Sequence, residues 1–122
     1  MINQIFILFI FMLITEKEIE FSKSKIFVEK SDLNQYVKGD EVNFTFIFEN
    51  NSSNSFKIEE IHPSCTCTAS FFDKNIKPFS ENKITLTTTL KQFSQIKKND
   101  ATVTINNKVK YYYIYAELIS TN

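Results

Sequence analysis

The chain of 122 residues has few of the residues on which many catalytic and binding sites depend. It contains one glycine, one histidine, two cysteines and no tryptophan. A single glycine excludes a glycine-rich phosphate-binding loop, which needs several glycines to bring backbone N–H groups close to a phosphate. Because 14 basic residues balance 14 acidic ones, the basic face of a nucleic-acid-binding protein is not expected either. The single histidine leaves no spacing typical of a catalytic triad, so we do not expect an enzyme.

The longest apolar run is also too short to cross a membrane. Residues 5–14 read IFILFIFMLI, whereas a transmembrane helix needs about 20 apolar residues. The run has the length of the hydrophobic region of a signal peptide, although no Lys or Arg precedes it and no small-residue cleavage site follows it. Residues 1–20 are therefore predicted to be a signal peptide or an uncleaved N-terminal membrane anchor, with a buried strand or helix as the alternative. We expect export to the periplasm or cell envelope, with membrane contact only through this leader.

Beyond the leader, apolar residues recur with a period of two, which is typical of β-strands. The strongest strand is Glu41–Glu49, where the alternate residues form one apolar face: Val42, Phe44, Phe46 and Phe48. The other predicted strands are 25–30, 56–61, 65–72, 83–90, 101–105 and 109–118. A bulge at Glu59–Glu60 is expected, because the alternation changes phase there.

Turn-forming residues separate these segments, and none of them shows sustained helical periodicity. Examples are the NNSSNS stretch at 50–55 and the NNK stretch at 106–108, which favours a tight hairpin. The pattern predicts an all-β fold over residues 25–120, an immunoglobulin-like antiparallel β-sandwich of about seven strands.

The last predicted strand carries three tyrosines on one face. Its inward face is expected to hold Tyr112, Ile114, Ala116 and Leu118, so Tyr111, Tyr113 and Tyr115 point the other way. An exposed row of tyrosines is a candidate partner surface, since tyrosine is enriched at protein interfaces. The alternative is that the rings stack across strands and only stabilise the sheet.

The stretch HPSCTCT, residues 62–68, concentrates the residues best suited to metal or redox chemistry. It holds the only histidine, His62, and both cysteines, Cys65 and Cys67. On an extended segment the side chains of residues i and i+2 point to the same face, so the two sulfurs could share a ligand. His62 precedes a proline at the end of a strand, a position where a histidine is commonly a surface residue.

Three interpretations of the cysteine pair remain open. The thiolates could bind a soft metal such as copper or zinc, with His62 as a third ligand, although a structural zinc site needs four. They could form a disulfide, but an extended segment separates the Cα atoms by about 7 Å, the upper limit for a bridge, unless the backbone bends. They could also be reduced thiols that act as small buried hydrophobic groups.

The order of these features resembles the bacterial family called domain of unknown function 1573, whose members are similar to Hydin-type immunoglobulin-like domains. The resemblance covers roughly residues 26–119. The matching residues are Gly39-Asp40, Phe44, Phe46, Phe48-Glu49-Asn50, Ile58, Ile61, Ser64-Cys65-Thr66-Cys67-Thr68 and Pro78. The resemblance implies an exported immunoglobulin-like fold, and it implies no known activity.

The chain departs from this family pattern at three positions, each of which usually holds a glycine, and one of them lies later in the pattern than the two described next. The family usually has glycine between the two cysteines, where this chain has Thr66, and glycine after the proline, where it has Phe79. Taken together, the patterns favour a non-catalytic exported module that binds or scaffolds a protein partner in the cell envelope. No cofactor is expected. The alternative function is copper or zinc binding, or thiol–disulfide chemistry, at Cys65 and Cys67.

Overall fold

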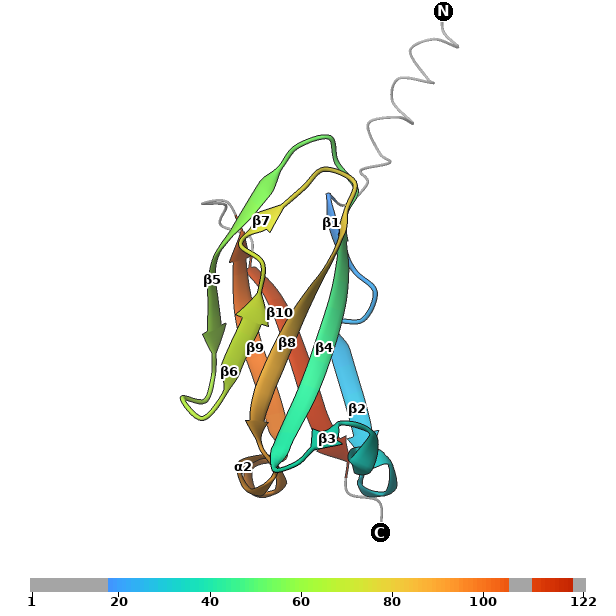
Figure 1. The fold of residues 1–122 in the computed structure, drawn as a ribbon, viewed down its shortest axis with the longest axis vertical. Helices are drawn as coiled ribbons and strands as arrows, with labels where there is room; N and C mark the ends of the chain where they lie inside the picture. Colours follow the sequence, from blue (N-terminus) through green and yellow to red (C-terminus); the bar gives the residue numbers. More distant parts are fainter. Residues whose placement is uncertain (1–17, 106–110, 120–122) are drawn as a thin grey trace, which may run out of the picture.

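The computed structural model describes residues 18–105 and 111–119, which form two packed β-sheets (Figure 1). Sheet 1 runs in the order β1 (Ile19–Phe21), β4 (Glu41–Asn50), β8 (Glu81–Thr89) and β6 (Ala69–Phe72), and β3 (Val37–Lys38) also pairs with β4. Sheet 2 runs in the order β2 (Lys25–Glu29), β10 (Tyr111–Ile119), β9 (Lys98–Ile105), β5 (Phe56–Pro63) and β7 (Asn75–Ile76). The described strands pair in antiparallel fashion except β2 and β10, which are parallel. The predicted all-β sandwich is confirmed.

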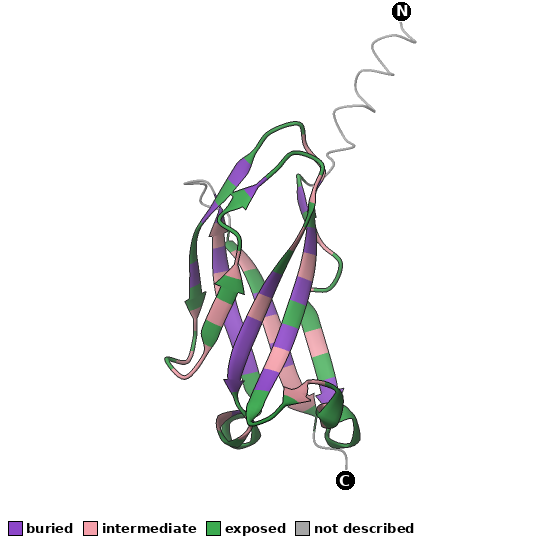
Figure 2. Ribbon diagram, in the orientation of Figure 1, coloured by how far each residue is buried: buried purple, intermediate pink, exposed green. Residues whose placement is uncertain are grey.

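The core lies between the two sheets and follows the predicted alternation (Figure 2). On β4, Val42, Phe44, Phe46 and Phe48 are each at most 1% exposed, while the residues between them lie at the surface or half-buried. On β10, Ile114 and Ala116 are buried and Tyr112 and Leu118 are half-buried, which is the inward face expected from the sequence. The rings of Phe21 of β1 and Tyr112 of β10 pack together across the two sheets, with their centroids 5.6 Å apart.

The bulge predicted in β5 is also present. The register between β5 and β9 shifts between Ile58 and Glu60, and both Glu59 and Glu60 are exposed. Since the shift restores the phase, Ile58 and Ile61 both face the core although they are three residues apart.

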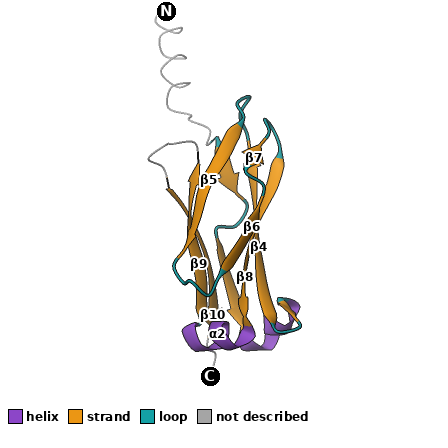
Figure 3. Ribbon diagram, turned by 60° about the vertical axis from the view of Figure 1, so that its left-hand side comes forward, coloured by secondary structure: helices purple, strands orange, loops and turns teal. Residues whose placement is uncertain are grey.

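Two short helices close one end of the sandwich, and the sequence pattern did not predict them (Figure 3). They are η1 (Lys30–Gln35), a 3₁₀ helix, and α2 (Leu90–Ile96). Helix α2 begins where the strand pattern was expected to continue to Leu90, because Thr89 caps it by accepting a hydrogen bond from the N–H of Gln92 at 3.2 Å. The helix buries Phe93, whose ring lies 5.0 Å from that of Phe44.

Other differences from the prediction concern short segments. Strand β1 overlaps the end of the predicted leader, so the sandwich begins before residue 25. The two-residue strand β7 lies in a stretch expected to be loop. Residues 65–68 form a turn, so the strand expected from residue 65 begins only at Ala69. The leader run at 5–14 and the turn predicted at 106–108 lie outside the described residues.

Candidate functional site

Cys65 and Cys67 lie in the turn that connects β5 of sheet 2 to β6 of sheet 1. The two residues are joined by a disulfide, and their Cα atoms are 5.1 Å apart. An extended segment would separate the Cα atoms by about 7 Å, but the backbone bends here, which is the condition under which the sequence allowed a bridge. Within the turn, the N–H of Cys67 also donates a hydrogen bond to Sγ of Cys65 at 3.2 Å.

Two polar residues at the start of β9 hold this turn at both ends. At its first end, Ser64 donates its N–H to the carbonyl oxygen of Asp100 at 3.1 Å and its hydroxyl to Oδ1 of the same residue. At its other end, Thr68 donates its hydroxyl to Oδ1 of Asn99 at 2.8 Å. The turn and the disulfide are therefore fixed to the sheet by side chains, in addition to the strands on either side.

Asn99 and Asp100 lie just before the predicted strand 101–105, and their role was not predicted from the sequence. Both are buried, at 3% and 6% exposure. Adjacent residues on a strand point to opposite faces, so Asn99 lies on the core side of β9 and Asp100 on its outer side. The sequence did offer one signal of their role, because this polar pair stands immediately before the apolar alternation of Ala101 to Ile105.

Asp100 also contacts the tyrosines of β10. Its Oδ2 accepts a hydrogen bond from the hydroxyl of Tyr113, while its Oδ1 accepts from Ser64. Burial, the hydrogen bond with Asp100 and the negative charge of that carboxylate together raise the pKa of Tyr113 to about 12. The phenol is thus held in its neutral, donating form.

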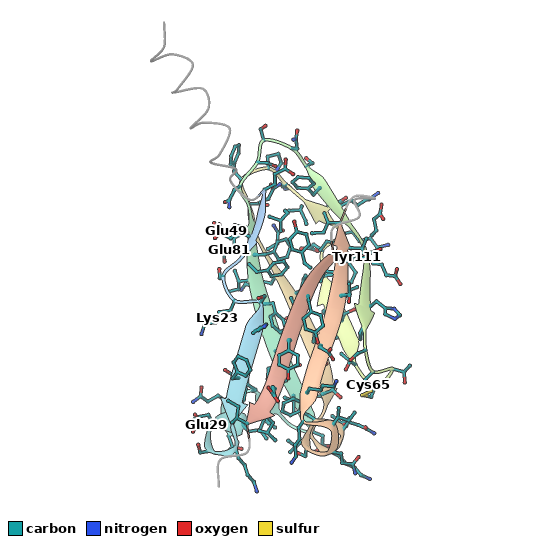
Figure 4. The ribbon with its side chains drawn as sticks, turned by 180° about the vertical axis from the view of Figure 1, so that it is seen from behind. Lys23, Glu29, Glu49, Cys65, Glu81 and Tyr111 are labelled. Carbon is teal, nitrogen blue, oxygen red and sulfur yellow. A yellow bond between two sulfur atoms is a disulfide. The ribbon has the colours of Figure 1, made fainter. Side chains whose placement is uncertain are left out.

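The outer face of sheet 2 carries a row of aromatic side chains, which we call the tyrosine face: Phe27, Tyr111, Tyr113 and Tyr115. The rings of Tyr113 and Tyr115 stack with centroids 6.0 Å apart, and Phe27 of β2 meets Tyr115 at 6.2 Å. Tyr111 is 66% exposed, Phe27 54% and Tyr113 48%. Figure 4 shows this side of the molecule, with Tyr111 and Cys65 labelled.

The structure does not gather His62 and the two cysteines into one group. His62 lies on β5 opposite Thr102, its side chain is 77% exposed, and its Nδ1 is 3.7 Å from Oε1 of Glu60. In the described part of the chain, no group of three or more His, Cys, Asp or Glu side chains is arranged to hold a metal ion. The two cysteines and the tyrosines, by contrast, are linked through Asp100.

A family model described as protein of unknown function (DUF1573) matches residues 19–118. The chain belongs to the DUF1573 family. The matched segment begins at the first residue of β1 and ends within β10, so the family pattern spans the whole sandwich. No curated protein matches this DUF1573 member.

One solved structure similar to this DUF1573 protein is the crystal structure of a protein of unknown function from Porphyromonas gingivalis W83. The TM-score is 0.58 at 12% sequence identity, over 82% of this chain and 46% of that one. At this identity the likeness supports the fold alone. This chain spans about half of the length of that protein.

Proposed function

We propose that this chain is an exported, non-catalytic module of the cell envelope that binds a protein partner through the tyrosine face. The observation that carries the proposal is the exposure of Phe27, Tyr111 and Tyr113 on one sheet face, where Tyr115 contacts both Phe27 and Tyr113. Tyrosine and phenylalanine are enriched in protein interfaces, where a rigid ring buries a large area at a small entropic cost.

The arrangement of the rings favours a protein partner over a carbohydrate. A sugar ring stacks on the open face of an aromatic side chain. The faces of Tyr113 and Tyr115 are turned toward each other, with an interplanar angle of 27°. One face of each of these two rings is therefore covered by the other ring, which leaves less open ring face for a sugar than for the mixed contacts of a protein interface.

Two features support export. The apolar run at residues 5–14 has the length of a signal-peptide core. Disulfides persist in oxidising compartments outside the cytosol, and the chain carries one at Cys65–Cys67. None of the helices in the described ranges is both long and apolar enough to span a membrane.

The polar groups near the turn support a structural role over a catalytic one. Asp100 is the only buried carboxylate among the described residues, and both of its oxygens accept hydrogen bonds from hydroxyl groups. His62, the only histidine of the chain, is directed to solvent beside Glu60, and Ser64 donates to Asp100 instead of to an imidazole. This arrangement differs from the nucleophile–base pairing that covalent catalysis needs.

Site-directed photo-crosslinking in the expressing cell tests the binding function. Benzoylphenylalanine at position 111 should give a discrete adduct with a protein other than a second copy of this chain. The matched control is position 71, because Phe71 is 60% exposed but lies on β6 of sheet 1. Equal adducts from both positions, or none from position 111, would contradict the proposal.

Intact mass of the chain from the periplasmic or envelope fraction tests export and shows whether the leader is removed.

The disulfide favours a second candidate function, thiol–disulfide exchange at Cys65 and Cys67. In such a reaction the reduced pair passes two electrons and two protons to the disulfide of another protein and becomes the bridged form. The reduced pair would also be the form that binds copper or zinc, with His62 as the nearest candidate third ligand in sequence. Replacing both cysteines by serine separates the functions, since partner binding at position 111 should survive and exchange or metal uptake should be lost.

A further inference from the structure

Strand β2 forms one edge of sheet 2. It pairs with β10 on one side, and in the ranges 18–105 and 111–119 no strand pairs with its other side. Figure 4 shows β2, with Glu29 labelled at its end, at the outer margin of the sheet. An edge strand presents a row of unpaired N–H and C=O groups, and these can receive a further strand.

The backbone groups of β2 that point to this edge belong to alternate residues. The carbonyl oxygen of Ser24 accepts a hydrogen bond from the N–H of Tyr115 at 2.9 Å, which continues the ladder of the parallel pair. Residues at even positions of β2 therefore direct their backbone groups toward β10. Lys25, Phe27 and Glu29 direct theirs toward the open edge.

The five residues of β2, KIFVE, are complementary to themselves in one antiparallel register. If two copies pair about Phe27, the two Phe27 side chains lie opposite each other and Lys25 of each copy lies opposite Glu29 of the other. Opposite charges and aromatic pairs in these positions stabilise antiparallel strands. The residues brought opposite each other are also those whose backbone groups point to the edge, so they can exchange hydrogen bonds across it.

We propose that the chain forms a symmetric dimer by antiparallel pairing of β2 with β2 of a second copy. Such an interface is isologous, because the same strand is used on both sides of a two-fold axis. It joins the two copies of sheet 2 into one continuous sheet. The tyrosine face then continues from one copy to the other across the axis, since Phe27 contacts Tyr115 within each copy.

The charges on β2 distinguish this pairing from non-specific association. Charged residues on an edge strand commonly prevent pairing, and a single sign of charge would do so here. Lys25 and Glu29 instead carry opposite signs at equal distances from Phe27, and both are exposed. Antiparallel pairing places each charge beside its complement, whereas parallel pairing of two copies would oppose like charges.

The interface is small, so the dimer is expected to be weak and dependent on concentration. Five paired residues in each copy bury less than the roughly 1,200–2,000 Å² of a standard interface. Sedimentation velocity of the purified chain over a concentration series should show a monomer–dimer equilibrium. Because each interface contains the charge pair twice, Lys25→Glu or Glu29→Lys alone should raise the dissociation constant about tenfold or more.

The double variant Lys25→Glu with Glu29→Lys restores both pairs in reversed order, so it should dimerise within about threefold of the unchanged chain. This recovery separates loss of pairing from loss of folding. Lys83→Glu is the matched control, because Lys83 is an exposed strand lysine on β8 of sheet 1. It should leave the dissociation constant unchanged.

Two results would overturn the proposal. One is a chain that stays monomeric up to about 1 mM, the range of the weakest specific associations. In that case either a strand of another protein pairs with the edge of β2, or the charges of Lys25 and Glu29 prevent pairing there. The other is a dimer whose dissociation constant does not respond to the single reversals or is not restored by the double one. Neither result bears on the crosslinking at position 111, so this proposal and the partner-binding function fail independently.

Discussion

Asp100 joins the turn that contains the two cysteines to the tyrosine face. Replacing it by alanine leaves the hydroxyls of Ser64 and Tyr113 without their shared acceptor. Hydrogen bonds to a charged group contribute about 1.5–3 kcal/mol, so we expect the free energy of unfolding to fall by about 2 kcal/mol. Urea unfolding measures this loss. Thr102→Ala, two residues further along the same face of β9, is the control and should change stability by less than about 1 kcal/mol.

Tyr113 should give the chain a characteristic response to alkaline pH. Its folded-state pKa of about 12 lies above the ordinary tyrosine pKa of 10.0, so the folded state keeps a proton that the unfolded state loses. Its contribution to stability is therefore complete below pH 10 and is lost as the pH rises toward 12. The pKa of Tyr115 is raised as well, so two tyrosines should titrate late in an absorbance titration of tyrosinate. The group with a pKa of about 12 should be missing in Tyr113→Phe, and its persistence in that variant would contradict the assignment.

Phe79 occupies a backbone conformation that favours glycine. Its φ is 50°, and its side chain is 73% exposed, so the ring compensates little for the left-handed backbone. The DUF1573 family pattern usually has glycine at this position after proline. The positive φ explains that preference, because glycine adopts this conformation without strain. Phe79→Gly should raise the free energy of unfolding by about 1 kcal/mol relative to Phe79→Ala. Both variants remove the same ring, so equal stabilities in urea unfolding would show that the backbone is unstrained.

At the scale of strands, the sequence predicted the long elements well because their burial alternates strictly. Strands β4 and β10 kept their predicted inward faces, and the phase change near Glu59 predicted the bulge in β5. The short elements were missed because two to seven residues give too little periodicity. Strand β1 overlaps the end of the predicted leader, and α2 depends on the cap at Thr89 and on the contact of Phe93 with the core.

The candidate site was predictable only in part. The three tyrosines were correctly placed on the outward face of one strand, since that follows from the period of two. The turn at Cys65 and Cys67 was assigned to a strand, and the two anchors Asn99 and Asp100 were missed altogether. Their role depends on β9 lying beside the end of β5, and long-range pairing of this kind is not encoded in local patterns.

At the scale of the whole molecule, the stability of the sandwich resides between the sheets and its candidate functional groups lie outside that core. The buried side chains of sheet 1, such as Phe46 and Ile84, pack against those of sheet 2, such as Val103 and Ile114. The disulfide and the tyrosine face lie at the turn and on the outer surface, where Tyr111 and Tyr113 remain exposed. Substitutions at these outer groups should therefore alter binding or redox behaviour more than folding.

This separation predicts a large difference between two variants. Replacing both Cys65 and Cys67 by serine opens a loop of only three residues, and loop-closure entropy then gives a loss of about 1–2 kcal/mol at most. The hydrogen bonds from Ser64 and Thr68 still hold the turn. Phe46→Ala instead leaves a cavity in the core, where the side chain is 1% exposed, and should cost about 3–5 kcal/mol. Urea unfolding of both variants measures the difference. A double serine variant that loses as much stability as Phe46→Ala would show that the disulfide is required for the fold, and would weaken the case for a reversible dithiol at this turn.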